Sequence, residues 1–145
     1  MPEAQAYPAT RHDASPLIDL GDKAERERLS ADAARGFFNI MSLWKIRDEE
    51  ARRLLGGMSN GAYYALKKQP DRVLDEDRLR RISYLVGIFK ALNILYGKDL
   101  ADRWMGLPNR NRIFAGSRPV DYLMRGGLPA FATLRNLLDA RRGGA

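Results

Sequence analysis

The sequence predicts an all-α protein in which several helices pack around one long central helix. Alternation of polar and apolar residues, which is typical of strands, never persists for more than a few positions. Apolar residues instead recur three and four positions apart, the spacing that gives a helix one buried face. With 145 residues the chain is long enough for one domain, or for two small lobes that share a core.

The first predicted helix covers residues 30–45. Ser30 suits its N-cap, where a hydroxyl accepts a hydrogen bond from a backbone amide. Apolar side chains then follow on one stripe: Ala34, Phe37, Phe38, Met41 and Trp44. Residues 1–28 contain six acidic and four basic side chains, with three prolines in the first 16 positions. This composition favours a flexible N-terminal arm.

Two short helices are predicted next, over residues 48–55 and 59–69. The first opens on three acidic residues, which suit a helix N-terminus, and ends at a Gly-Gly pair. The second begins at Ser59. Helix, glycine-bearing turn and helix together form a helix-turn-helix pattern, so we expect a domain over residues 29–73.

The longest predicted helix covers residues 75–96, with Asp75 as its N-cap and Gly97 at its end. Its apolar positions lie three and four residues apart, and we expect them to form the core together with aromatic residues from other helices. The expected core contains Leu79, Ile82, Val86, Phe89, Leu92, Phe38, Trp44 and Trp104.

The remainder of the chain completes a second expected domain over residues 74–145. A short amphipathic helix (98–106) precedes a polar loop (107–118). Pro119 then starts a helix that a Gly-Gly pair ends, since proline favours the first helical position. Pro129 starts the last helix, which is expected to run to about Ala140.

Composition excludes several kinds of function. The chain has no cysteine, which removes disulfides, thiolate metal sites and cysteine nucleophiles. His12 is its only histidine, so few side chains are suited to acid–base catalysis or to binding a metal ion. We therefore expect that the protein is not an enzyme and binds no metal or cofactor. No run of 18 apolar residues and no signal peptide is seen, so a cytoplasmic protein is expected. The formal net charge of +7 favours an anionic partner.

The helix-turn-helix pattern predicts one such partner, DNA. In this motif the second helix enters the major groove, where Asn can read adenine and cationic or hydroxyl-bearing side chains hold phosphates. The candidate contacts are Ser59, Asn60, Tyr63, Tyr64, Lys67, Lys68 and Arg72. A purely structural helical hairpin remains the alternative.

Two other segments could contact an anionic partner. The loop carries Arg110, Arg112 and Arg118 and no acid. It is either a contact surface or a connector whose apolar residues, Ile113 and Phe114, plug the core. At the end of the chain, two arginines and two glycines either cap the last helix or form a flexible cationic tail that enters a pocket on a partner.

Residues 104–116 read W-M-G-L-P-N-R-N-R-I-F-A-G and are followed by R-P-V-D-Y-L. This string resembles the toxin-binding domain of Xre/MbcA/ParS-type antitoxins, which has a W-x3-PN-x4-F-x-G core. The ending L-L-D-A-R-R-G-G also fits the family, as do the upstream strings L-L-G at residue 54 and R-I-S at residue 81. The resemblance covers about residues 30–145.

The resemblance implies an antitoxin whose partner is a RES-domain toxin that uses NAD, either degrading it or ADP-ribosylating a target. Such antitoxins block the NAD cleft with their C-terminal end, usually repress their own operon, and commonly form homodimers. The toxin-binding residues carried over are Asn109, Arg110, Arg112, Phe114, Gly116, Arg118, Arg135, Asp139, Arg141, Arg142, Gly143 and Gly144. The tail arginines would pair with acids at the cleft rim or simply fill space. A stand-alone helix-turn-helix regulator without a toxin is the alternative.

Overall fold

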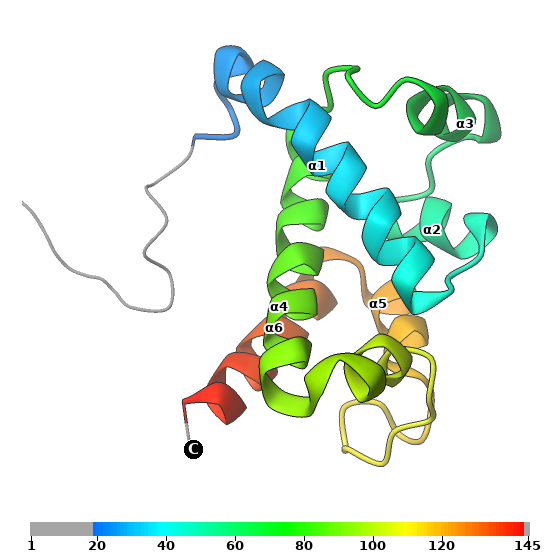
Figure 1. The fold of residues 1–145 in the computed structure, drawn as a ribbon, viewed down its shortest axis with the longest axis vertical. Coiled ribbons are helices and arrows are strands. Elements are labelled where there is room, and N and C mark those ends of the chain that lie inside the picture. The colour runs from blue at the N-terminus through cyan, green and yellow to red at the C-terminus, as the bar shows by residue number, and fades with distance from the viewer. Residues whose placement is uncertain (1–18, 144–145) are drawn as a thin grey trace, which may run out of the picture.

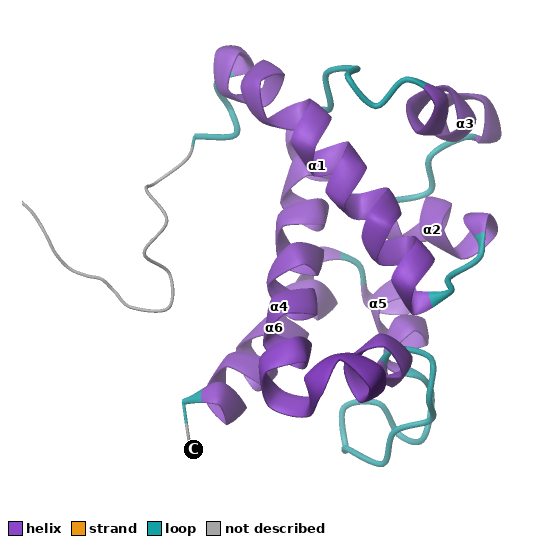
Figure 2. Cartoon of the chain, viewed as in Figure 1, coloured by secondary structure: helices purple, strands orange, loops and turns teal. Residues whose placement is uncertain are grey.

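A computed structural model describes residues 19–143, and this part of the chain is helical with no strand, as predicted (Figures 1 and 2). The helices are α1 (Lys23–Trp44), α2 (Asp48–Leu54), α3 (Asn60–Lys68), α4 (Glu76–Trp104), α5 (Pro119–Gly126) and α6 (Leu128–Arg142). None of these helices is both long and apolar enough to cross a membrane.

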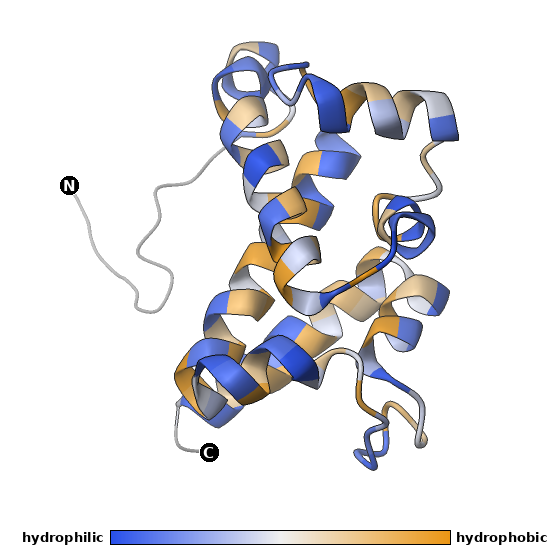
Figure 3. Cartoon of the chain, turned by 45° about the vertical axis from the view of Figure 1, so that its right-hand side comes forward, coloured by the Kyte–Doolittle hydropathy of each residue, from blue (hydrophilic) through white to orange (hydrophobic). Residues whose placement is uncertain are grey.

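Helix α4 is the centre of the fold. Helices α1 and α6 make the most extensive contacts with it, α5 packs on α6 and α2, and α3 packs on α1 (Figure 1). Hydrophobic stripes on these helices face one another, while hydrophilic residues cover the outer surfaces (Figure 3). Burial of these stripes provides the main stabilisation of the fold.

The start of α1 differs from the prediction. The helix begins at Lys23, and its N-cap is Asp22, whose side chain accepts from the amide of Ala24. Ser30 is therefore not an N-cap; it is fully buried, and its hydroxyl accepts from the amide of Leu74 at 2.9 Å. Residues 23–28 are helical rather than part of an arm, and the expected arm over residues 1–18 lies outside the described residues.

Gly97 divides α4 into two helical segments, which confirms the prediction that the long helix ends there. Its backbone has φ 75° and ψ 166°, values outside the helical range and available at low cost only to glycine. The helical segment after the kink turns away from the axis of the first and leads into the loop before α5 (Figure 1).

The buried face of α4 is wider than predicted. Leu79, Ile82 and Leu92 are buried as expected, and so are Trp44 and Trp104. Because α1 and α6 cover α4 from two sides, a further row is also buried, consisting of Leu85, Ile88 and Ala91. The prediction was wrong for three residues that are only half-buried: Phe38, Val86 and Phe89.

Candidate functional site

The loop over residues 107–118 is held together by its asparagines. The Asn109 side chain accepts from the amide of Asn111 at 2.8 Å, and the Asn111 side chain accepts from that of Ile113 at 3.1 Å. Such side-chain bonds two residues along the chain define tight turns. The Asn109 amide also donates to Ser117, and its carbonyl accepts from Gly116, which closes the loop on itself.

Phe114 anchors this loop in the core. Its side chain is fully buried, and its ring makes edge contacts with Trp104 and Tyr122, with centroid distances of 5.8 and 5.4 Å. Gly116, two residues later, has φ 85°, a conformation that lets the chain leave the core sharply. Phe114 therefore supports the loop from below, and its side chain is not exposed in the structure of the chain alone.

The three arginines of the loop differ in their surroundings. Arg110 and Arg112 are exposed, and neither forms an ion pair with any described residue. Arg118 instead contacts Glu50 at 2.9 Å and Asp121 at 2.7 Å through the same nitrogen, Nη2. The hydrogen bond from Arg118 is the main cause that holds the pKa of Asp121 below its usual value.

Arg118 thus joins α2 to the start of α5. Glu50 is a nearly buried carboxylate on α2, with 8% of its surface exposed. Without Arg118 this acceptor would lose its closest cation, so the guanidinium stabilises the fold.

The end of α6 is also tied to its own chain. Arg135 binds Asp139 at 2.9 Å, and Arg142 approaches the same carboxylate at 3.6 Å. Arg141 donates to the hydroxyl of Tyr96 on α4 at 2.8 Å.

The helix consequently ends at Arg142 rather than near Ala140, and the prediction of a flexible tail from residue 141 is wrong for both arginines. Gly143 is exposed, and Gly144 lies outside the described residues.

A close helix–helix contact underlies this arrangement. The guanidinium of Arg135 lies so near Gly87 of α4 that a Cβ atom there would overlap with it. Gly87 and Tyr96 are the residues that sequence reasoning missed, since only the packing of α4 on α6 reveals them.

Helix α3 begins at Asn60, and Ser59, the predicted start, is its N-cap, whose hydroxyl accepts from the amide of Ala62 at 3.2 Å. The carboxylate of Asp48, at the start of α2, gathers three of the predicted DNA contacts. It accepts from Tyr63 at 2.6 Å, from Tyr64 at 3.2 Å and from Lys67 at 2.9 Å. The hydrogen bonds from Tyr63 and Lys67 are the main causes that lower the pKa of Asp48. Burial and the carboxylate of Asp48 raise the pKa of Tyr63.

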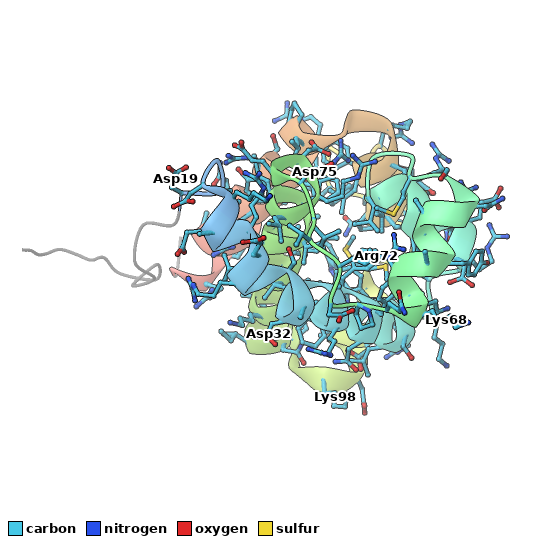
Figure 4. The ribbon with its side chains drawn as sticks, turned by 90° about the horizontal axis from the view of Figure 1, so that it is seen from above. Asp19, Asp32, Lys68, Arg72, Asp75 and Lys98 are labelled. Atoms are coloured by element: carbon cyan, nitrogen blue, oxygen red, sulfur yellow. The ribbon has the colours of Figure 1, made fainter. Side chains whose placement is uncertain are left out.

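These contacts divide the residues predicted to bind DNA into those that are bonded within the fold and those that are exposed. Tyr63 is only 1% exposed and belongs to the core, and the charge of Lys67 is balanced by Asp48. Asn60, Lys68 and Arg72 are exposed. The last two lie at the end of α3 and in the segment that follows it (Figure 4).

The two predicted surfaces lie at opposite ends of the molecule. In the view of Figure 1, α3 is at the top, whereas the loop before α5 and the C-terminal end of α6 are both at the bottom. Each surface therefore leaves the other accessible.

Residues 91–144 match a family described as the antitoxin Xre/MbcA/ParS C-terminal toxin-binding domain. This chain belongs to the Xre/MbcA/ParS antitoxin family. It is also similar to "Uncharacterized protein y4oB" of Sinorhizobium fredii (strain NBRC 101917 / NGR234). The two are 32% identical over 122 residues, which cover 79% of this chain and 92% of the relative. No solved structure matches the chain.

The matched range includes both the loop over residues 107–118 and the whole of α6. The chain is thus an antitoxin of a toxin–antitoxin pair, and its partner is a toxin protein. Within the matched domain, Arg110 and Arg112 of the loop are exposed, whereas Arg141 and Arg142 at the end of α6 are partly buried.

Proposed function

We propose that this antitoxin neutralises a RES-domain toxin that acts on NAD, and that it does so by covering the active-site cleft with the C-terminal end of α6. The observation that carries the proposal is the match of residues 91–144 to a toxin-binding domain. In the structure, this domain presents the loop with Arg110 and Arg112 at the same end of the molecule as the end of α6 (Figure 1).

The charges suggest how the two proteins would meet. A cleft that binds the pyrophosphate of NAD must itself be positive, so cationic side chains of the antitoxin do not belong on its floor. Arg110 and Arg112 instead suit acidic groups on the rim, where opposite charges speed association and fix orientation.

The bonds at the end of α6 favour occlusion by a preformed element. Arg141 is held by Tyr96, and Arg142 lies against Asp139, so the last turn of the helix is ordered before the toxin arrives. Because this turn is already ordered, binding avoids an entropic cost of about 1–2 kcal/mol for each of its residues.

The same protein is proposed to repress its own operon as a homodimer. Asn60, Lys68 and Arg72 belong to the predicted DNA-binding set, are exposed, and carry polar groups suited to bases and phosphates. A dimer would place two such surfaces on half-sites about one helical turn apart.

The proposal is tested by co-expression with the product of the neighbouring gene. Cells that express the neighbour alone should stop growing and lose NAD, and this antitoxin should restore both and co-purify with the toxin. Free ADP-ribose in extracts would show NAD hydrolysis, whereas ADP-ribose attached to protein would show transfer. A neighbour that is harmless and does not bind the antitoxin would leave the stand-alone regulator as the better account.

A further inference from the structure

A cavity of about 330 Å³ lies on the side of α4 where the turn after α2 faces the turn between α5 and α6. Three guanidinium groups and several glycines line it. The residues that matter here are Arg53, Arg81, Arg125, Gly56, Gly57 and Gly127. It lies apart from the loop over residues 107–118 and from the end of α6.

Arg81 is the fixed member of the three. Its Nε donates to Asp77 at 2.9 Å, its Nη1 to the carbonyl of Leu54 at 3.4 Å, and its guanidinium lies 5.7 Å from the ring centre of Phe131. The remaining nitrogen, Nη2, donates to none of the described residues. The side chain is thus held in place, with one pair of N–H bonds available toward the cavity.

Two glycine turns keep the space beside Arg81 open. A Cβ atom at Gly56 would lie 3.4 Å from Nη2, and one at Gly127 would lie 4.0 Å from it. These glycines have φ values of 87° and 65°, which other residues rarely adopt. The nitrogen therefore points between two turns whose shape depends on glycine.

The cavity carries excess positive charge. Arg53 and Arg125 are exposed, and neither forms an ion pair within the described part of the chain. The carboxylate of Asp77 is already bound to Arg81. Three guanidiniums that line one cavity, only one of them paired with a carboxylate of a described residue, give it a positive potential that favours an anion.

We propose that this cavity binds a phosphate group. The planar fork of arginine matches two phosphate oxygens, and three arginines can surround one group. The volume is at the lower end of that of small-molecule sites, which suits a phosphate or a pyrophosphate rather than a large ligand. The group comes from a soluble phosphate compound or from a DNA backbone.

Occupation of this site would connect the two halves of the protein. Arg53 precedes the turn between α2 and α3, whereas Arg125 belongs to α5 in the matched toxin-binding domain. A phosphate that bridges them would stabilise the contact between the helix-turn-helix and that domain.

The test measures binding of inorganic phosphate and of pyrophosphate to the full chain by calorimetry, at constant ionic strength in chloride. The variant Arg53→Ala/Arg125→Ala removes two exposed side chains and should remain folded, as circular dichroism would verify. We expect saturable binding that weakens at least about tenfold in this variant. The matched control, Arg35→Ala/Arg103→Ala, has the same change in charge at exposed sites outside the cavity and should bind as the wild type does.

A third arm uses a short DNA duplex of arbitrary sequence. Saturable binding of the free anions with unchanged duplex affinity would identify a soluble ligand. A loss of duplex affinity in the cavity variant but not in the control, with pyrophosphate competing for the duplex, would identify a backbone phosphate. The proposal is overturned if the wild type binds neither the anions nor the duplex saturably, or if the control weakens binding as much as the cavity variant does.

Discussion

Helix α3 carries two cationic side chains and the loop over residues 107–118 carries three, but the two regions hold them in different ways. On α3, Tyr63, Tyr64 and Lys67 converge on the carboxylate of Asp48. In the loop, asparagine turns and a buried phenylalanine shape the backbone, while Arg110 and Arg112 extend into solvent. The number of cations in a segment therefore says little about how many of them a partner can use.

The same comparison separates the side chains that stabilise each region from those that are available to a partner. The side chains that shape each region are buried or internally bonded, as Tyr63 and Phe114 are. The ones left for a partner are those with no role in the fold. Four predictions test this division, starting with the largest expected effect.

Phe114→Ala should destabilise the protein most. The variant leaves a cavity beneath the loop and removes contacts to Trp104 and Tyr122, so we expect the free energy of unfolding to fall by about 3–5 kcal/mol. Chemical denaturation measures it. Tyr64→Ala removes a half-exposed aromatic residue from the other region and should cost less than about 1 kcal/mol. Equal losses in the two variants would show that Phe114 is not the anchor of the loop.

Arg118→Ala should have the next largest effect. It leaves the carboxylate of Glu50 nearly buried without its closest partner, so we expect a loss of about 1–3 kcal/mol in the free energy of unfolding. Arg110→Ala, in the same loop, should change it by less than about 0.5 kcal/mol. If both variants melt at the temperature of the wild type, Arg118 does not join α2 to α5.

Asp48→Asn should alter the pH dependence of stability. The pKa of Asp48 is lowered in the folded state, so its stabilising effect is complete above the usual value of 3.8 and disappears as the pH falls through the lowered value. Because the carboxylate is partly exposed to water, the effect is about 1 kcal/mol or less. Unfolding measured from about pH 6 to pH 2 should show a shallower acid loss in the variant. Identical slopes would mean that Asp48 does not organise α3.

The smallest expected difference concerns DNA. Each phosphate contact that is removed should lower the slope of log affinity against log salt by about 0.9. Lys68→Ala and Arg72→Ala should each show this change if they hold phosphates. Lys67→Ala should change the slope less, since Asp48 already binds its ammonium group. Fluorescence anisotropy with an operator duplex measures all three, and a larger change for Lys67→Ala would reverse our ranking.

Features that depend on neighbouring residues were predictable from the sequence. Asp75 and Ser59 cap their helices through bonds to amides three positions later, and Gly97 breaks the long helix. Two alternatives were left open for the loop, and Phe114 is buried in the core as one of them predicts. The signals for these features lie within a few residues of the feature itself.

Features that depend on distant contacts were not predictable. Ser30 and Asp22 are both residue types that suit an N-cap, but the hydroxyl of Ser30 instead accepts a hydrogen bond from the amide of Leu74, 44 residues away. Arg141 looks unattached in the sequence, yet its partner Tyr96 lies 45 residues earlier on another helix. Cationic side chains in this chain could be sorted into bonded and available ones only once the packing was known.

The central claim is that the C-terminal end of the antitoxin blocks the toxin by direct occlusion. Its most direct test compares the full chain with a variant that lacks residues 141–145, mixed in equal amounts with the purified toxin, while NAD consumption and binding are measured separately. We predict that the shortened antitoxin still binds through the loop and α6, but that NAD consumption returns. Full inhibition by the shortened antitoxin would contradict occlusion by this end. Inhibition would then have to come from the helix and loop, or from an inactive assembly of the toxin.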